Sequence, residues 1–276
     1  MNKEVERIIK PPKGLHLNLS ELWEYRELFY FFTWRDIKVK YKQTFLGVAW
    51  AVLQPLSLMV VFSFFFGRLL NVGSEGMPYP IFFYSGILLW TIFSTGFSGA
   101  GNSMVVHANM IKKIYFPRLI IPMSSILVAL FDFLMAFVVY IGILVYYDYH
   151  VEISKMLVYL PLSVFLTLIT CFGAGSMLAA LVVKYRDFRY IITFLVQLLF
   201  FITPIVWPWS RIGAEWQQMV LSLNPMTGAI NLARASLIDQ PVNWEQIGIS
   251  GGMAILLLFA GLLFFRKTES TFADVA

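Results

Sequence analysis

Long apolar runs, separated by short polar stretches, fill most of the chain after residue 45. A helix needs about 20 mostly apolar residues to cross a bilayer. Five or six segments meet this length, and we expect six spans: Leu46–Leu70, Ile81–Val106, Ile120–Tyr146, Met156–Val183, Tyr190–Pro208 and Ile247–Phe265. Strands of a membrane barrel would be about 10 residues long with alternating polarity. The pattern therefore predicts an all-α integral membrane protein with six transmembrane helices.

An amphipathic segment precedes the first apolar run. Its apolar side chains recur every three or four residues: Leu22, Tyr25, Phe29 and Phe32. A helix of this kind buries its apolar face at the headgroup boundary of a membrane. We expect an N-terminal amphipathic interface helix over residues 20–34.

The stretch from Trp209 to Gln246 differs from the other loops. Its middle part is moderately apolar but is broken at Asn224-Pro225 and at Gly228, so neither half can cross a bilayer. Two short re-entrant helices before the last span fit this pattern, provided that protein or a wet cavity surrounds their ends. An amphipathic hairpin resting on the outer surface fits it equally well.

The composition also indicates a lipid environment. Of the 276 residues, 59% are apolar and 13% are charged, whereas soluble domains average about 25% charged residues. The single cysteine, Cys171, cannot form an internal disulfide and does not indicate a redox compartment.

The charges divide the chain into a cytoplasmic segment (1–45), a transmembrane domain (46–266) and a cytoplasmic tail (267–276). The first segment holds nine of the 21 Lys and Arg residues and lacks the apolar core of a secretory signal. With the N-terminus in the cytoplasm, 17 of the 21 cations fall on the cytoplasmic side. Short cytoplasmic loops are enriched in Lys and Arg, so we expect both termini to be cytoplasmic.

Four cations stand just before the first span: Arg35, Lys38, Lys40 and Lys42. Each is worth about 1 kcal/mol near an anionic leaflet. These residues form either a rim that binds anionic lipid or a phosphate-bearing substrate, or an anchor that only fixes topology.

No enzyme active site is visible. The chain has no P-loop, and its Gly-Ala-Gly triplets at 99–101 and 173–175 lie inside apolar helices, where small residues allow close helix packing. The three histidines are too dispersed for a metal site. We expect no catalytic residue, no bound metal and no cofactor in this chain.

Asp132 is the one carboxylate deep inside a predicted span. Such a residue is a candidate proton or ion relay by default. It stands alone, with no second acid or cation at a comparable depth, and a relay needs more members. A structural role is the alternative, with the carboxyl neutral or hydrogen-bonded inside the bundle.

Several segments, in order from about residue 20 to 240, resemble the polysaccharide-exporting permeases of the ABC-2 type. They are Trp34–Thr44 with Gly47, Trp50, Gln54 and Pro55; Leu89–Ser94; Asn109 with Lys112–Arg118; Tyr185-Arg186-Asp187; Thr203-Pro204-Ile205; and Asn224-Pro225. The resemblance implies a permease subunit that forms a homodimer and docks two copies of a separate ATPase, which binds ATP and Mg²⁺. It also implies a lipid-linked polysaccharide substrate, most consistent with O-antigen, and the bacterial cytoplasmic (inner) membrane. We expect no nucleic-acid partner.

The resemblance assigns two loops to ATPase coupling: Asn109, Lys112, Lys113, Tyr115, Pro117 and Arg118 in the first, and Tyr185, Arg186 and Asp187 in the second. The first, His107–Ile121, is short, basic and aromatic, and Pro117 and Pro122 bound it. Because proline restricts the residue before it, we expect a brief helix with firm ends. An outer gate is expected at Pro204, Trp207, Trp209, Asn224 and Pro225.

A conduit for a glycan needs aromatic faces, scattered polar groups and few charges. Two stripes with helical spacing have this character: Trp50, Gln54, Ser57 and Phe64 in the first span, and Tyr190, Phe194, Gln197 and Phe201 in the fifth. Each contains one glutamine that is costly to expose to lipid. We expect both to line the channel, with ordinary helix packing as the alternative for any single aromatic residue.

Two rival functions differ in their requirements. A secondary transporter or channel would use Asp132 as its coupling site and would favour an internal repeat, which is not found. A membrane enzyme for lipid-linked sugars would carry clustered acids or histidines at one membrane face, whereas here they are dispersed.

Overall fold

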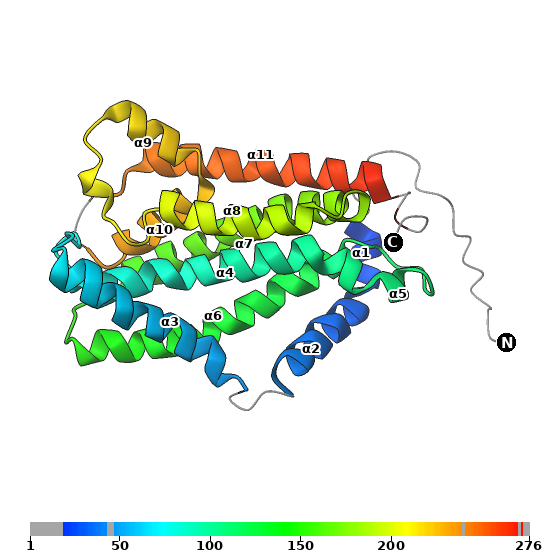
Figure 1. Ribbon diagram of the computed structural model, residues 1–276, viewed down its shortest axis with the longest axis horizontal. Helices are drawn as coiled ribbons and strands as arrows, with labels where there is room; N and C mark the ends of the chain where they lie inside the picture. Colours follow the sequence, from blue (N-terminus) through cyan, green and yellow to red (C-terminus); the bar gives the residue numbers. More distant parts are fainter. Residues whose placement is uncertain (1–18, 43–46, 239–240, 270–271, 273–276) are drawn as a thin grey trace.

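The computed structural model describes residues 19–42, 47–238, 241–269 and 272, and these residues form helices and connecting segments without a β-strand. The helices run along one long axis (Figure 1). In chain order they are α1 (Leu19–Glu24), α2 (Arg26–Lys42), α3 (Ala49–Phe62) continuing as the π-helix η1 (Ser63–Leu69), α4 (Tyr79–Val106), α5 (Ala108–Ile111), α6 (Ile120–Tyr146), α7 (Ile153–Lys184), α8 (Phe188–Ile202), the 3₁₀ helix η2 (Trp209–Arg211), α9 (Glu215–Ser222), α10 (Pro225–Ala235) and α11 (Trp244–Glu269).

Five helices of the described chain are long and apolar enough to cross a membrane: α3 with η1, α4, α6, α7 and α11. The expected span Ile120–Tyr146 coincides with α6 at both ends. The expected fifth span, Tyr190–Pro208, was too long, because α8 has 15 residues and ends at Ile202. Thr203 adopts an extended backbone before Pro204, as the clash of a proline ring with the preceding residue requires.

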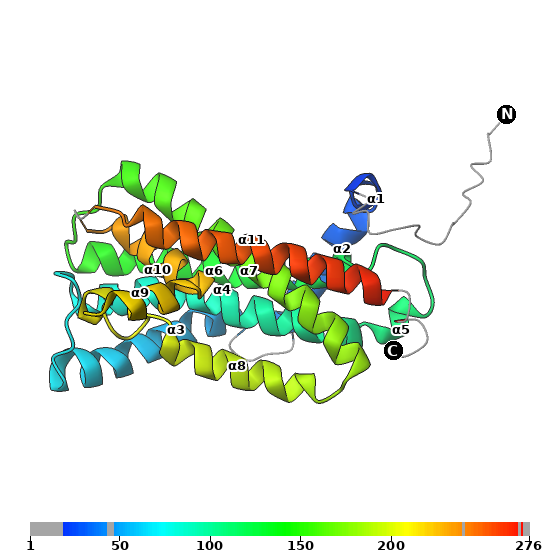
Figure 2. The same ribbon diagram turned by 90° about the horizontal axis from the view of Figure 1, so that it is seen from above.

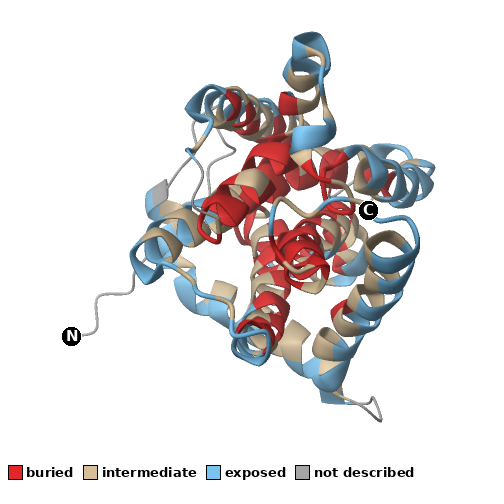
Figure 3. Ribbon diagram, turned by 90° about the vertical axis from the view of Figure 1, so that its left-hand side faces the viewer, coloured by how far each residue is buried: buried red, intermediate tan, exposed pale blue. Residues whose placement is uncertain are grey.

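Helix α4 occupies the centre of the bundle and contacts α3, α6, α7, α8 and α10. Its most apolar window has a mean hydropathy of 1.4 and is 78% buried, whereas that of α11 has 2.3 and is 22% buried. Buried residues accordingly gather in the middle of the end-on view, and the surrounding helices are more exposed (Figure 3). The central helix packs mostly on protein, so it can carry Ser and Gly. The outer helices need apolar side chains because they face lipid.

Helices α7 and α11 cross at glycines. A Cβ atom placed on Gly261 would lie 1.9 Å from the carbonyl oxygen of Gly173, and one on Gly173 would lie 2.5 Å from the Leu258 backbone. A Cβ on Gly175 would likewise lie 2.7 Å from that of Ala100 on α4. The expected close packing at the Gly-Ala-Gly triplet of α7 is confirmed, since only glycine permits these approaches.

The amphipathic N-terminal segment is helical and packs against protein. Phe32 is fully buried in a cluster at the α1–α5 end of the bundle, with Leu22, Tyr25 and Phe29 against the same cluster. The expected helix over residues 20–34 is two helices broken at Tyr25, and α2 continues to Lys42 along α6. The predicted apolar face is therefore confirmed, and the predicted end was too early.

The region before the last span contains the two expected short helices, α9 and α10. Helix α10 is buried along nearly its whole length between α4, α7 and α11. The alternative of a hairpin resting on the outer surface is wrong for α10, whereas α9 buries only Ser222. Gly228 allows the insertion, because a Cβ there would lie 2.4 Å from that of Ser250 on α11.

Candidate functional site

The loop between α4 and α6 projects from the bundle at the same end as α1 (Figures 1 and 2). Its helix α5 covers only four residues, so the expected brief helix is shorter than the loop, and a turn and extended chain follow it. Asn109, Lys112, Lys113 and Tyr115 are exposed, while Pro117 is buried. Pro122 lies in the first turn of α6 rather than in the loop.

Arg118 anchors the base of this loop. Its guanidinium donates to the carbonyl oxygen of Glu269 at the end of α11 and lies 5.7 Å from the ring centroid of Phe272. At the exposed end, the Tyr115 hydroxyl donates to Glu21 of α1 across 3.3 Å. The base of the loop is thus bonded to the end of α11, whereas its basic tip is exposed.

The second predicted coupling segment lies at the same end, between α7 and α8 (Figure 1). Tyr185, Arg186 and Asp187 are all exposed. Lys184 lies 5.1 Å from the ring centroid of Tyr185. Helix α7 ends here because Tyr185 has an extended backbone.

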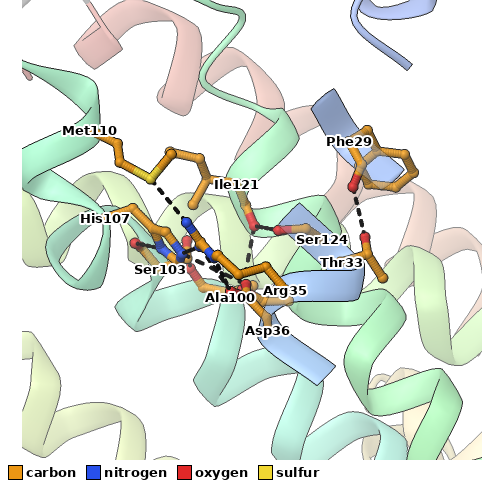
Figure 4. A network of polar contacts seen from close by, with 11 residues as sticks. Phe29, Thr33, Arg35, Asp36, Ala100, Ser103, His107, Met110, Ile121 and Ser124 are labelled. Carbon is orange, nitrogen blue, oxygen red and sulfur yellow. Dashed lines mark hydrogen bonds and ion pairs between the residues drawn. The ribbon is translucent and has the colours of Figure 1, made fainter. Parts of the chain in front are cut away.

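A polar network joins α2 to the end of α4 (Figure 4). Arg35 bonds Asp36 at 2.8 Å, donates to Met110 Sδ at 3.0 Å and contacts His107 Nε2. His107 is buried, and its Nδ1 lies 2.9 Å from the carbonyl oxygen of Ser103. Burial alone would raise the pKa of Asp36, but hydrogen bonds from His107 and Arg35, together with their charge, hold it below its ordinary value. Arg35, one of the four cations of the predicted rim, therefore faces the end of α4.

Asp132 is bonded in the structure. Its carboxylate accepts from Lys40 Nζ and from the Tyr41 hydroxyl, both near the end of α2. Burial and this hydrogen bond raise the pKa of Tyr41. The expectation that Asp132 stands alone was wrong, because its partners come from the interface helix rather than from another span. The alternative structural role, hydrogen-bonded inside the bundle, fits these contacts.

The four cations of the predicted rim therefore differ in their contacts. Arg35 and Lys40 bond carboxylates of the protein, although Lys40 is exposed, as are Lys38 and Lys42, and Arg35 alone of the four is half-buried. Lys38 lies 5.2 Å from the ring centroid of Trp34. A cavity of about 470 Å³ lies between α2, α4 and α6, and Lys40 is among its lining residues.

The two predicted channel stripes occupy helices on one edge of the bundle, where α3 and α8 both lie (Figure 2). Phe62 of α3 meets Phe200 of α8 with ring centroids 5.9 Å apart. All stripe residues are exposed in the single chain: Trp50, Gln54, Ser57, Phe64, Tyr190, Phe194, Gln197 and Phe201. One copy does not enclose either stripe.

The predicted outer-gate residues converge at the opposite end of the bundle. Asn224 caps α10 by accepting from the Met226 amide at 3.1 Å, and its Nδ2 donates to Thr203 Oγ1 at 2.8 Å. This bond joins the start of α10 to the end of α8. Pro204 and Pro225 are buried, and Trp207 and Trp209 are half-buried.

Arg234 is the functional candidate that the sequence analysis missed. It is 1% exposed on α10, and it donates to the carbonyl oxygens of Pro204, Phe82 and Ile205 at 2.5, 3.1 and 3.0 Å. Its guanidinium also lies 3.6 Å from the ring centroid of Phe82. The sequence signal was an arginine inside an apolar segment, and it is one of the four cations that the charge bias leaves outside or near the outer face.

Within the described ranges, no three His, Cys, Asp or Glu side chains are grouped so that they could hold a metal ion.

Five helices long and apolar enough to cross a membrane, packed around the central helix α4, are typical of an integral membrane protein. The family model described as the ABC-2 type transporter matches residues 27–238. The chain belongs to this family.

Relatives of known name align over nearly all of the chain. An O-antigen export system permease protein RfbA from Myxococcus xanthus is 27% identical over 93% of this chain and 98% of its own length. A protein of the same name from Klebsiella pneumoniae is 27% identical over 87% and 92%. The polysialic acid transport protein KpsM of Escherichia coli is 23% identical over 85% of this chain and 91% of its own length.

Proposed function

We propose that this chain is the membrane subunit of an ATP-driven exporter that moves a lipid-linked polysaccharide, most consistent with O-antigen, across the bacterial inner membrane. The observation that carries this is the alignment with RfbA permeases over nearly the full length of both chains. The chain itself is not an enzyme in this proposal, and ATP and Mg²⁺ bind to the partner.

The loops at the α1–α5 end face the cytoplasm in this proposal, as do both termini. The Lys and Arg bias supports this orientation, with 17 of 21 cations on that side. The ATPase docks on the exposed tip of the first loop, with Lys112, Lys113 and Tyr115, and on Arg186 in the second loop. Because Arg118 ties the base of the first loop to the end of α11, movement of the loop reaches the bundle directly.

Two copies form the conduit. The stripes on α3 and α8 combine exposed aromatic rings with Gln54 and Gln197, and glutamine is costly to expose to lipid. A second copy facing this edge would enclose both stripes. The two copies together bind two ATPase subunits.

Deletion of the gene tests the function. We expect surface polysaccharide to be lost and its lipid-linked precursor to accumulate inside the cell, with recovery when the gene is restored. Purification of the tagged chain should bring down a P-loop ATPase. Unchanged surface glycan together with no associated ATPase would refute the proposal.

Charge reversal in the first loop tests the coupling surface. Lys112→Glu with Lys113→Glu should weaken ATPase association about tenfold or more, since it places two acids on an exposed basic tip, and it should leave thermal stability unchanged. Lys155→Glu, near the opposite end of the bundle, is the control. Normal association of the double variant would remove this loop from the proposed contact.

A further inference from the structure

A cavity of about 540 Å³ lies at the end of the bundle opposite α1 and α5, between η2, α9 and the beginning of α11. It falls in the size range of small-molecule binding sites. A second chamber of about 100 Å³ extends from it towards α10, and Trp209, Asn243 and Gln246 line both. None of the predicted channel residues and none of the predicted coupling residues is among the lining residues of this cavity.

The lining of the larger chamber combines two indole rings with amides and carboxylates. Trp209 and Trp216 supply the rings, and Trp216 is 67% exposed although it is a large apolar residue. Gln218, Asn243, Glu215 and Glu245 supply the polar atoms. A sugar ring presents C–H groups on its faces and hydroxyls at its edge, so an aromatic face beside amide and carboxylate groups matches it on both sides.

One amide in this lining has no partner. Gln246 is 5% exposed, and its Nε2 makes no hydrogen bond within the described part of the chain. Asn231 of α10 lines the smaller chamber, and its Nδ2 is also buried and without a partner in those residues. Burying an amide without a partner costs free energy, and such groups in native proteins call for an explanation, such as a functional role or bound water.

Two other polar side chains of α10 and its N-terminus are paired. Arg234 donates to three backbone carbonyls, and Asn224 caps α10. The buried side-chain atoms without a partner on α10 and at the start of α11 include Gln246 Nε2 and Asn231 Nδ2, whose residues line the chambers, and Thr227 Oγ1, whose residue does not.

The charges of the cavity select among sugars. Glu215 and Glu245 line the larger chamber, and no Lys or Arg among the described residues does so. In the smaller chamber, Glu75 accompanies Arg234, whose guanidinium is occupied by carbonyl oxygens. Carboxylates accept hydrogen bonds from hydroxyl groups but repel another carboxylate.

We propose that this cavity binds an uncharged sugar segment of the exported polysaccharide as it emerges past the outer gate. The inference rests on the proposed function and adds a site and a preference for neutral over acidic glycan. Binding is weak, because a polymer in transit must leave each site that it enters.

Binding can be measured with the full chain, together with its ATPase, in lipid nanodiscs. The probe is a lipid-free oligosaccharide of neutral sugars, released by mild acid from the surface polysaccharide of the source cells and titrated by saturation-transfer NMR. Polysialic acid oligomers are the acidic comparison. We expect the neutral probe to bind at least tenfold more tightly than the acidic one.

Two variants distinguish an effect on sugar binding from an effect on the stability of the fold. Trp216→Ala should weaken binding about tenfold. Gln246→Leu should weaken it about fivefold while leaving the melting temperature unchanged or raising it, because it removes an unpaired buried amide. The control is Trp244→Ala, since Trp244 lies at the same end but packs on Tyr159, with ring centroids 6.2 Å apart, outside the cavity.

Three outcomes would overturn the inference: unchanged binding in both variants, equal binding of the acidic probe, or a lower melting temperature for Gln246→Leu with binding intact. The last would show that the amide serves folding, through water in the smaller chamber. If deletion of the gene abolishes export but these variants bind and export normally, only this inference fails. If deletion leaves the surface glycan unchanged, the proposed function fails first.

Discussion

The guanidinium of Arg234 donates to the carbonyl oxygen of Pro204 across 2.5 Å. This bond joins the re-entrant helix α10 to the segment that follows α8, about 30 residues earlier in the chain. The same guanidinium reaches α4 through the carbonyl of Phe82. One buried side chain thus holds three elements together where the outer gate is predicted.

Replacing this residue tests its role. Arg234→Met keeps much of the apolar stem but leaves the carbonyls of Pro204, Phe82 and Ile205 without their donor. A hydrogen bond to a charged group contributes about 1.5–3 kcal/mol, so we expect a loss of about 3 kcal/mol or more, seen as a lower melting temperature in detergent. Arg211→Met is the control, because Arg211 is exposed and donates to the Asn71 carbonyl oxygen across 3.5 Å. A melting temperature that falls equally in both variants would contradict the role of Arg234 in holding the three elements together.

Two glycines of α11 differ in their surroundings. A Cβ at position 261 would lie 1.9 Å from the Gly173 carbonyl oxygen, whereas one at position 252 would meet nothing within 4 Å. Gly261→Ala should therefore separate α7 from α11 and cost about 1–3 kcal/mol or more. Gly252→Ala should be neutral or stabilising by about 0.5–1 kcal/mol, since alanine favours a helix. Thermal unfolding of the two variants in parallel checks this, and equal stability would show that the crossing tolerates a methyl group.

Much of the fold was predictable because lipid imposes long apolar runs. The bounds of α6, the amphipathic face at Phe29 and Phe32, and the break at Asn224-Pro225 all follow from local patterns. The end of α8 was placed too late, since apolar residues continue past Ile202 although Pro204 stops the helix.

The polar contacts were not predictable in the same way. Asp132 is separated from Lys40 by 92 positions, and Arg234 from Phe82 by 152. Hydropathy and charge counts describe each residue alone, so they gave Arg234 no role beyond a place outside or near the outer face and left Asp132 without a partner. Only the packing of α2 on α6 and of α10 on α4 brings these groups together.

The contact of Asp132 with α2 distinguishes a structural role from a proton relay. Asp132→Asn cannot carry a proton but still accepts a hydrogen bond from Tyr41, so we expect export to persist with a modest loss of stability. Lys40→Met removes the cation from the carboxylate, leaves the Tyr41 hydroxyl as its donor, and should cost about 0.5–3 kcal/mol, the usual range for coupled pairs. The double variant Lys40→Met/Asp132→Leu should recover part of this loss. Abolished export in Asp132→Asn, at normal protein levels, would favour the rival secondary transporter.

The lowered pKa of Asp36 predicts how pH affects the network between α2 and α4. A carboxyl whose pKa is depressed in the folded state stabilises the protein above its unfolded pKa, ordinarily 3.8, and loses this contribution as the pH falls through the folded value. The stability difference between the native chain and Asp36→Asn should thus be present at about pH 5 and shrink below about pH 4. Melting temperatures of both proteins across this range check the prediction. A difference that disappears already between pH 5 and 7 would assign the effect to another group.

The exposed glutamines on α3 and α8 test the proposed conduit. Gln54 and Gln197 are both exposed in the single chain, so they face lipid, a second copy or the glycan. If they line the path, Gln54→Leu and Gln197→Leu should each lower export severalfold at normal protein levels, because an apolar side chain cannot bond sugar hydroxyls. If they faced lipid, leucine would instead stabilise the protein and leave export intact. Val138→Leu on α6 is the control, since Val138 is 65% exposed and lies on neither stripe. Export measured as surface polysaccharide per copy of the chain distinguishes the two cases, and full export by both glutamine variants would exclude these stripes from the conduit.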